Sequence, residues 1–129
     1  MPGATILLVD DDPVILKLLE VNFEMEGFTV LVARDGQEGV DVARSGRPDV
    51  IVSDIMMPNA SGLELVAALK HDPDTSRTPI ILLSAKAQTT DVRSGLDAGA
   101  DDYVTKPFEP LDLVDRVNRL PETRASKRS

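Results

Sequence analysis

Residues 49–58 read Asp-Val-Ile-Val-Ser-Asp-Ile-Met-Met-Pro, and this stretch decides the fold. Its Val and Ile residues follow one another without polar alternation, which is typical of a strand covered on both faces in a parallel sheet. The strand carries one carboxylate, Asp54, to its C-terminal end. Ligands of open parallel sheets bind at that edge, so Asp54 is placed for binding or chemistry. For Asp54 taken alone, a loop-capping role is an equally good interpretation.

The length and composition fit one globular domain with an acidic body. The chain has 129 residues, of which 42% are hydrophobic and 28% are charged, an ordinary composition for a single folded domain. The net charge is -8, and residues 121–129 hold three basic side chains and one acidic side chain, which leaves -10 on residues 1–120. We predict a domain over residues 1–120 and a basic tail or linker remnant over residues 121–129. The acidic body is expected to repel nucleic acid, so we predict no direct nucleic-acid binding by this domain.

The sequence also bears on location. It contains no cysteine, which excludes a disulfide framework and a thiolate metal site. Residues 1–5 lack the pattern of an export signal, and no apolar run reaches the roughly 18 residues that a membrane span needs. We therefore expect a cytoplasmic protein without a membrane partner.

Apolar strands alternate with amphipathic helices along the chain. Strands are predicted at residues 5–9, 28–33, 49–53, 79–83 and 102–105. Helices are predicted at residues 14–26, from 36 to about 45, 61–70, 88–97, and from about 108 to 120. Five strands alternating with five helices predict an α/β protein with a flavodoxin-like, doubly wound parallel sheet. The strand order 2-1-3-4-5 is taken by analogy from such folds.

Local signals mark the helix ends and the inward faces. Asp12 before Pro13 and Ser61 three residues before Glu64 are predicted N-caps. The spacing of apolar residues predicts the following inward residues: Ile15, Leu18, Leu19, Asn22 and Met25 in the first helix, Val40 and Ala43 in the second, Val92 and Leu96 in the fourth, and Leu111, Val114, Val117 and Leu120 in the fifth.

Polar groups follow four strands that are neighbours in this order. Asp10 and Asp11 follow the first strand, and Asp54 follows the third. Ser84 follows the fourth strand and Lys106 the fifth. Taken singly, these residues could be solvated acids, a loop hydroxyl and a surface lysine. Their occurrence at four adjacent strand ends favours a common site.

The residue types at this site indicate phosphoryl transfer. Two carboxylates about 4 Å apart repel by about 4 kcal/mol at an effective dielectric near 20, so a cation or a proton must accompany them. Carboxylate oxygens without His or Cys favour Mg²⁺. We predict that Asp10 and Asp11 hold Mg²⁺, that Asp54 accepts a phosphoryl group, and that Lys106 and Ser84 hold its oxygens.

Four motifs carry a family resemblance. They are residues 7–13 (LLVDDDP), Asp54 with Met57-Pro58 and Gly62, residues 80–85 ending in Ser84-Ala85, and residues 99–108 (GADDYVTKPF). Together they resemble the receiver domain of bacterial two-component response regulators over about residues 5–120. The resemblance implies a phospho-accepting signalling domain rather than an enzyme.

The resemblance implies particular roles and partners. Asp54 takes the phosphoryl group from a histidine kinase or a histidine phosphotransfer protein. The backbone carbonyl of Met56 joins Asp11 and Asp54 on the metal, and the Lys106-Pro107 peptide is cis. Signalling passes from Ser84, which turns toward the phosphoryl group, to Tyr103, which turns inward.

The same resemblance locates a switching surface. Turning of Tyr103 reshapes the face made by the fourth helix, the fifth strand and the fifth helix. Asp101, Asp102 and Tyr103 with Arg93 and Arg116 resemble the charge pattern of receivers that pair through this face, which predicts a phosphorylation-linked homodimer. Separately, Met56 and Lys86 border the route of an attacking water and neither is an evident base, which predicts a long-lived acyl phosphate.

Two other interpretations remain open from the sequence. A pseudo-receiver would use the same fold as a binding surface without phosphorylation. A small phosphatase similar to the haloacid dehalogenases would use Asp10 of Asp10-x-Asp12 as its nucleophile, but this leaves Asp54 and the residues after it unexplained. Locating the phosphorylated residue separates these interpretations.

Overall fold

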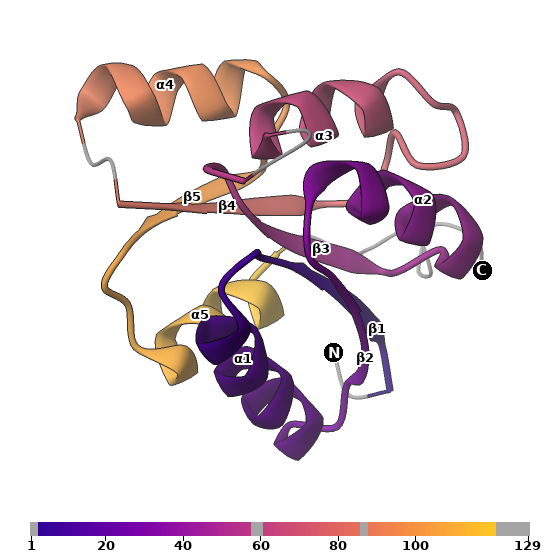
Figure 1. Ribbon diagram of the computed structural model, residues 1–129, viewed down its shortest axis with the longest axis vertical. Helices are drawn as coiled ribbons and strands as arrows, with labels where there is room; N and C mark the ends of the chain where they lie inside the picture. The colour runs from indigo at the N-terminus through magenta and orange to yellow at the C-terminus, as the bar shows by residue number, and fades with distance from the viewer. Residues whose placement is uncertain (1–2, 58–60, 86–87, 121–129) are drawn as a thin grey trace.

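The structure is a computed structural model that describes residues 3–57, 61–85 and 88–120. Strands and helices alternate along these residues (Figure 1). The elements are β1 (Thr5–Val9), α1 (Pro13–Met25), β2 (Thr29–Ala33), α2 (Gly36–Gly46), β3 (Val50–Asp54), α3 (Gly62–Lys70), β4 (Ile80–Ser84), α4 (Thr89–Asp97), β5 (Asp102–Thr105) and α5 (Pro110–Asn118). The predicted tail at 121–129, the loop at 58–60 and Lys86 lie outside the described residues.

The strands form one parallel sheet in the order β2-β1-β3-β4-β5, as predicted. Val9 of β1 pairs with Ser53 of β3, Asp54 of β3 pairs with Leu83 of β4, and Ser84 pairs with Thr105 of β5. The C-terminal ends of β1, β3, β4 and β5 are therefore level with one another. This register brings the polar residues that follow these strands to one edge.

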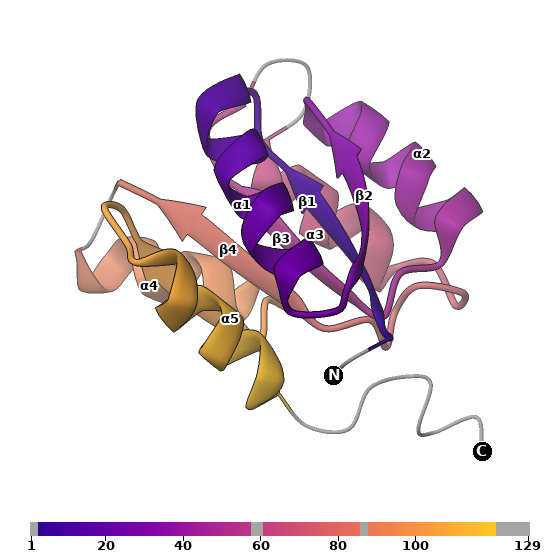
Figure 2. The same cartoon turned by 90° about the horizontal axis from the view of Figure 1, so that it is seen from below.

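The helices cover both faces of the sheet. α1 and α5 lie on one face, and α2, α3 and α4 lie on the other (Figures 1 and 2). Every residue of β3 and β4 is buried, because both strands are interior and covered on both sides. The strands that deliver Asp54 and Ser84 are thus the most deeply packed in the sheet.

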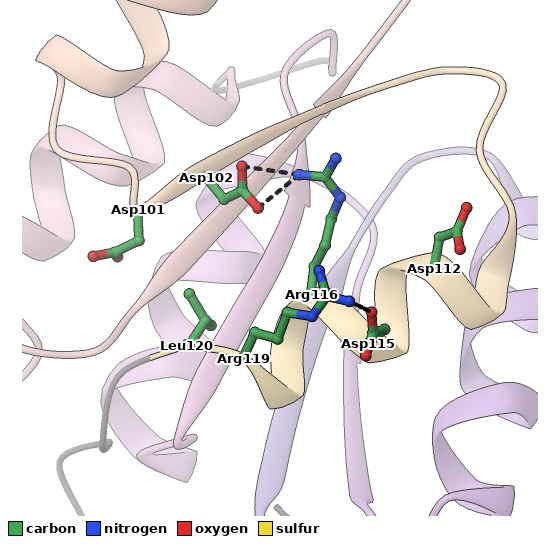
Figure 3. Close-up of a pocket in the computed structure, with 7 residues that line it drawn as sticks. All are labelled: Asp101, Asp102, Asp112, Asp115, Arg116, Arg119 and Leu120. Atoms are coloured by element: carbon green, nitrogen blue, oxygen red, sulfur yellow. Dashed lines mark hydrogen bonds and ion pairs between the residues drawn. The ribbon is translucent and has the colours of Figure 1, made fainter.

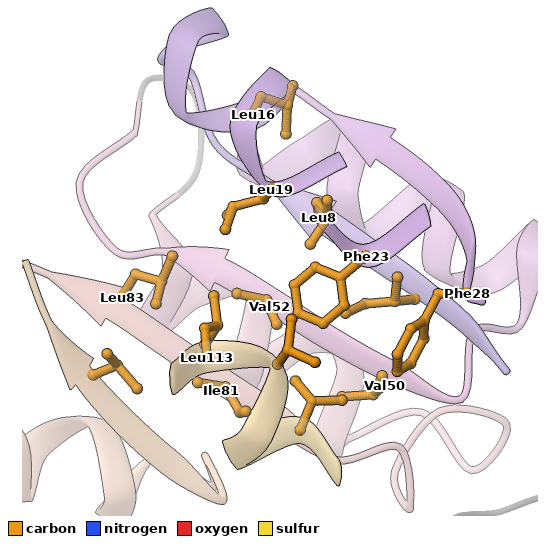
Figure 4. Packing of buried hydrophobic residues seen from close by; sticks show 14 residues of the cluster. Leu8, Leu16, Leu19, Phe23, Phe28, Val50, Val52, Ile81, Leu83 and Leu113 are labelled. Atoms are coloured by element: carbon orange, nitrogen blue, oxygen red, sulfur yellow. The ribbon is translucent and has the colours of Figure 1, made fainter. Parts of the chain in front are cut away.

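The core under α1 and α5 contains aromatic as well as aliphatic side chains (Figure 4). The rings of Phe23 and Phe28 meet edge to face, with centroids 5.1 Å apart, a favoured geometry for aromatic pairs. Leu113 of α5 packs into the same cluster. Each such fully buried side chain contributes about 1.5–3 kcal/mol of hydrophobic stabilisation. None of the described helices is long and apolar enough to cross a lipid bilayer.

The predicted caps are present. The Asp12 side chain accepts a hydrogen bond from Val14 N at 2.9 Å and begins α1. Ser61 and Glu64 form a reciprocal capping box at the start of α3. These contacts satisfy backbone N–H groups that have no partner inside the helix. Both helices therefore begin where the sequence indicates, close to the polar edge.

The predicted inward face of α1 was partly wrong. Leu16, Leu19 and Phe23 are buried, whereas Leu18 and Met25 are 46% and 78% exposed. Leu19 was predicted correctly as a buried residue, and Ile15 is partly buried and packs against the same core. The helix carries apolar side chains on opposite sides, so apolar spacing alone selects no unique inward face.

Smaller errors of the same kind occur in α5 and α4. Leu111 was predicted inward but is 65% exposed, and Leu113 takes its place in the core. Leu96 was predicted to anchor α4 but is 42% exposed, while its neighbour Gly95 is buried against β4 and β5. The predicted inward positions of Val114 and Val117 are confirmed.

Candidate functional site

Three carboxylates converge at the C-terminal edge of the sheet. Asp10 and Asp11 follow β1, and Asp54 is the last residue of β3. Asp10 and Asp54 are 1% and 5% exposed, whereas Asp11 is exposed to solvent. One oxygen from each lies within 4.8 Å of the others. The pairing of Val9 with Ser53 explains the contact, because it sets the next residues of the two strands side by side.

Lys106 brings a positive charge into this cluster from beyond β5. Its Nζ lies 3.3 Å from Asp54 Oδ2 and 3.5 Å from Asp10 Oδ2. The Lys106 N–H donates to the Ser84 carbonyl at 2.8 Å, which fixes the residue beside β4. The Lys106-Pro107 peptide is cis, as predicted. One cation therefore neutralises part of the charge of two buried carboxylates.

Burial raises the pKa of both Asp10 and Asp54 above the ordinary carboxyl value of 3.8. Lys106 opposes the rise for Asp54, and a hydrogen bond from Asp12 N opposes it for Asp10. That bond goes to Asp10 Oδ1 at 2.9 Å. The other oxygen, Asp10 Oδ2, is buried and accepts no hydrogen bond within the described residues.

The donor set fits a hard divalent cation. Three carboxylates stand against one lysine, and a buried oxygen of Asp10 has an unused acceptor site. Hard cations such as Mg²⁺ prefer carboxylate and carbonyl oxygens and retain several waters. The exposure of Asp11 leaves the cluster open to solvent on one side. A cation bound here would lower the electrostatic repulsion between the acids.

The start of α3 packs closely against the backbone next to Asp54 and is hydrogen-bonded to it. The Gly62 N–H donates to the Ile55 carbonyl at 2.9 Å, and a side chain at Gly62 would collide with the Asp54 carbonyl. The Ser53 hydroxyl donates a hydrogen bond to the Asp54 carbonyl at 2.9 Å. In the sequence Gly62 stands out only as part of the family motif, because no sequence pattern signals a contact between two backbone segments.

Ser84 and Tyr103 lie on the two strands next to β3 on this side of the sheet, and Tyr103 contacts α4 at Gly95. Ser84 ends β4 and is 1% exposed, two strands away from Asp10. Tyr103 lies on β5 and is 8% exposed, so its ring occupies the inward position. The side chain of Met56 is 60% exposed just beyond Asp54. The structure thus brings Asp10, Asp11, Asp54 and Lys106 into one cluster and places Ser84 beside it at the next strand end.

Fold and site together define a class: a flavodoxin-like parallel sheet with an acidic, lysine-containing centre at its C-terminal edge. A sequence model described as the response regulator receiver domain matches residues 6–118. The chain belongs to this family. Membership explains the four motifs and favours a signalling domain over the phosphatase interpretation.

Relatives and solved structures agree with the family. The chain is 44% identical over 120 residues to the phosphate regulon transcriptional regulatory protein PhoB of Pseudomonas aeruginosa, covering 93% of this chain and 52% of that protein. It is 44% identical over 112 residues to the DNA-binding response regulator MtrA of Mycolicibacterium smegmatis, covering 87% and 48%. The chain therefore spans about half the length of these relatives.

Two solved structures illustrate the fold. The chemotaxis response regulator CheY4 of Vibrio cholerae superimposes with a TM-score of 0.86 at 32% identity, over 91% of this chain and 98% of that one. The receiver domain of a sensor histidine kinase from Pseudomonas aeruginosa superimposes with a TM-score of 0.84 at 33% identity, over 91% and 96%. That second domain was solved with a magnesium ion coordinated in its active-site cleft.

Proposed function

We propose that Asp54 is the phosphoacceptor of this receiver domain. The observation that carries the proposal is the buried Asp54 carboxylate 3.3 Å from Lys106 Nζ, in a cluster with two further acids. A carboxylate oxygen of Asp54 attacks the phosphorus of a phosphohistidine, the P–N bond breaks, and an acyl phosphate forms. Lys106 and the Ser84 hydroxyl bind oxygens of the transferred group and stabilise its charge.

We infer that Asp10, Asp11 and Asp54, with the backbone carbonyl of Met56, hold Mg²⁺. The ion supplies charge neutralisation for the phosphoryl oxygens. The buried Asp10 Oδ2, which accepts no hydrogen bond within the described residues, and the carboxylate-only composition of the cluster support this assignment. Exposed Asp11 leaves room for the waters that Mg²⁺ retains.

The phosphodonor is a histidine kinase or a histidine phosphotransfer protein, and the outer face of α1 is where we place its docking surface. Val14, Leu18, Val21 and Met25 are 74%, 46%, 41% and 78% exposed and lie at helical spacing opposite the buried residues of α1. Such a stripe is suited to packing against another helix. Because α1 begins beside Asp10 and Asp11, a helical donor on this stripe lies next to the carboxylates. A phosphohistidine donor of this kind is expected in the cytoplasm.

The face of α4, β5 and α5 is the proposed output surface and homodimer contact. A cavity of about 440 Å³ on the β5 and α5 side of this face is lined mainly by charged residues (Figure 3). Arg116 Nη1 binds Asp102 at 2.9 Å within the chain, so a partner molecule would have to share or replace this pair. Surface pairs of this type set the register of a complex more than its affinity.

We place the domain proper at residues 1–120 and a basic tail or linker remnant at residues 121–129. MtrA and PhoB are described as DNA-binding and transcriptional regulators, and they are about twice as long as this chain. The body of this domain carries -10, so any contact of the full protein with nucleic acid belongs to a different segment.

The assignment is tested by intact mass after incubation with Mg²⁺ and a small-molecule phosphodonor. Native protein is expected to gain one hydroxylamine-labile phosphoryl group, and Asp54→Asn none. Asp41→Asn, which removes an exposed acid from α2, is the matched control and is expected to behave as native. A gain in Asp54→Asn would move the acceptor to another residue, with Asp10 first. No gain in native protein, beside a receiver that does react, would make this chain a pseudo-receiver.

A further inference from the structure

Helix α4 meets the edge of the sheet through a residue without a side chain. Gly95 lies in the C-terminal half of α4 and is buried, whereas the flanking Ser94 and Leu96 are exposed. Gly95 faces the ring of Tyr103 on β5 and the side chain of Leu82 on β4. α4 lies over this edge of the sheet in Figure 1. The inner surface of α4 is therefore flat where the tyrosine ring is placed.

The space at Gly95 is too small for a methyl group. A Cβ built on Gly95 would lie 2.9 Å from Tyr103 Cδ2, 3.2 Å from Tyr103 Cε2 and 3.1 Å from Leu82 Cδ1. Carbon atoms in ordinary contact are about 3.5–4.0 Å apart. With alanine at position 95, either the ring, the leucine or the helix must move.

Of the two side chains next to Gly95, that of Tyr103 can be displaced at the lower cost. Leu82 is fully buried in β4 between two other strands, so its displacement would disturb the centre of the sheet. Tyr103 lies on β5, at the edge of the sheet, and its neighbour Asp102 reaches the surface. Rotation about the first side-chain torsion takes a ring at an edge strand toward solvent without moving the backbone.

We propose that Gly95 is a positioning residue for Tyr103: the missing side chain of Gly95 forms the slot that holds the ring inward. The inward ring is the arrangement that the family resemblance associates with the signalling state, and the inference rests on the proposed phospho-accepting function for its biological meaning. A side chain at position 95 shifts the ring outward and biases the α4, β5 and α5 face toward the other state. Gly95 acts through Tyr103 and does not touch the phosphoryl group.

Intrinsic fluorescence tests the geometric part directly. The chain contains one tyrosine and no tryptophan, so tyrosine emission reports Tyr103 alone. Quenching by acrylamide is expected to increase about twofold or more in Gly95→Ala, because the ring moves from a buried to an exposed position. Ser94→Ala is the matched control, since it also raises helix propensity in α4 at an exposed position. Equal quenching in native protein and Gly95→Ala would overturn the proposal.

A double-mutant cycle separates the clash from effects on the helix alone. Replacing a helical glycine by alanine normally stabilises a protein, so Gly95→Ala should raise the unfolding midpoint once the ring is absent. We expect Gly95→Ala to lower the midpoint in native protein and to raise it in a Tyr103→Ala background. The same shift in both backgrounds would show that the ring and position 95 do not interact.

Phosphorylation gives the third comparison. If the ring position and the phosphoryl group are coupled, Gly95→Ala disfavours the phosphorylated state, and phosphorylation by a small-molecule donor slows by several-fold relative to Ser94→Ala. An unchanged rate would remove the link to signalling. If native protein takes no phosphoryl group at all, the proposed function fails, while the quenching and midpoint comparisons still decide whether Gly95 positions the ring.

Discussion

Lys106 reaches from the end of β5 to within 3.3 Å of Asp54 at the end of β3, across the intervening strand β4. The same Nζ lies 3.5 Å from Asp10. A lysine held in this position neutralises part of the charge of Asp54 before any phosphoryl group arrives, and under the proposed function it remains available to the phosphoryl oxygens afterwards. Stability and chemistry at this edge therefore depend on the same ammonium group.

Removal of that charge is expected to destabilise the protein. Lys106→Met should lower the free energy of unfolding at neutral pH by about 2–3 kcal/mol, somewhat below the cost of breaking a fully buried ion pair because a carboxyl can take up a proton instead. Urea unfolding without Mg²⁺ measures this. Lys17→Met removes an exposed lysine that pairs with Glu20 on α1, and it is expected to change stability by less than about 0.5 kcal/mol. Equal losses in the two variants would contradict a special role for Lys106.

The Asp54 carboxylate is expected to lower the stability of the metal-free protein at neutral pH. Burial raises the pKa of Asp54 above 3.8, so the native state keeps this proton to a higher pH than the unfolded chain does. The stabilising contribution of the protonated group is complete below 3.8 and is lost as the pH rises through the native pKa. Each unit of that rise corresponds to about 1.4 kcal/mol.

Asp54→Asn should therefore be more stable than native protein at pH 7 without Mg²⁺, by about 1 kcal/mol or more. Thermal unfolding between about pH 3 and 8 measures the difference, which should shrink in acid. A difference that stays constant with pH would indicate a packing effect instead of titration.

Substitutions of the neighbouring acids Asp11 and Asp12 are expected to have different effects, one on Mg²⁺ affinity and the other on stability. Asp11→Ala should reduce Mg²⁺ affinity by more than about tenfold, since it removes a ligand, and should leave metal-free stability unchanged because Asp11 is exposed. Asp12→Ala removes the N-cap of α1 and should lower stability by about 1 kcal/mol with little effect on Mg²⁺ affinity. Calorimetric titration with Mg²⁺ and urea unfolding of both variants distinguish these outcomes. The reverse pattern would exchange the roles assigned to the two residues.

Two leucines of α5 provide a matched test of packing. Leu113 is fully buried and Leu111 is 65% exposed. Leu113→Ala should lower the free energy of unfolding by about 2–5 kcal/mol, and Leu111→Ala by less than about 0.5 kcal/mol. Urea unfolding of the two variants gives both values. Comparable losses would mean that the solvent-facing side of α5 is covered in solution.

The outer stripe of α1 is expected to matter only for protein donors. Replacing Val14 and Leu18 by serine should slow phosphotransfer from a phosphorylated histidine protein by about tenfold or more, because the docking contact is lost. Phosphorylation by a small-molecule donor should be unchanged. Val32→Ser, an exposed apolar residue on β2, is the control. Slowing with both donors would show that the substitutions disturb the site itself.

The sequence determined the polar site more reliably than the helix faces. Asp10, Asp54, Ser84 and Lys106 were found because parallel strands end at one edge, so position along the chain translates directly into position in space. Predicting which face of a helix is buried requires a contrast between an apolar side and a polar side. In α1 that contrast is weak, and Leu18 was consequently exchanged for Leu16.

Sequence patterns could not predict the close contacts that involve glycine residues. Gly95 lowers helix propensity and was not among the inward residues predicted for the helix at 88–97, which were Val92 and Leu96. Its contact with Tyr103 depends on how closely α4 approaches β5, which no local signal records. Gly62 against the Asp54 carbonyl is a second case, since the close approach involves main-chain atoms of residues eight positions apart.

The two sides of α1 are subject to separate physical constraints. Leu16, Leu19 and Phe23 are held by close packing against the sheet, where a change of one methyl group is felt. Val14, Leu18 and Met25 face solvent, where substitutions change stability by about 0.5 kcal/mol or less. If this side is the proposed docking surface, its residues can diverge after gene duplication without loss of the fold or of the acidic centre. Substitutions that keep one signalling pathway separate from another could therefore all lie on the exposed side of α1.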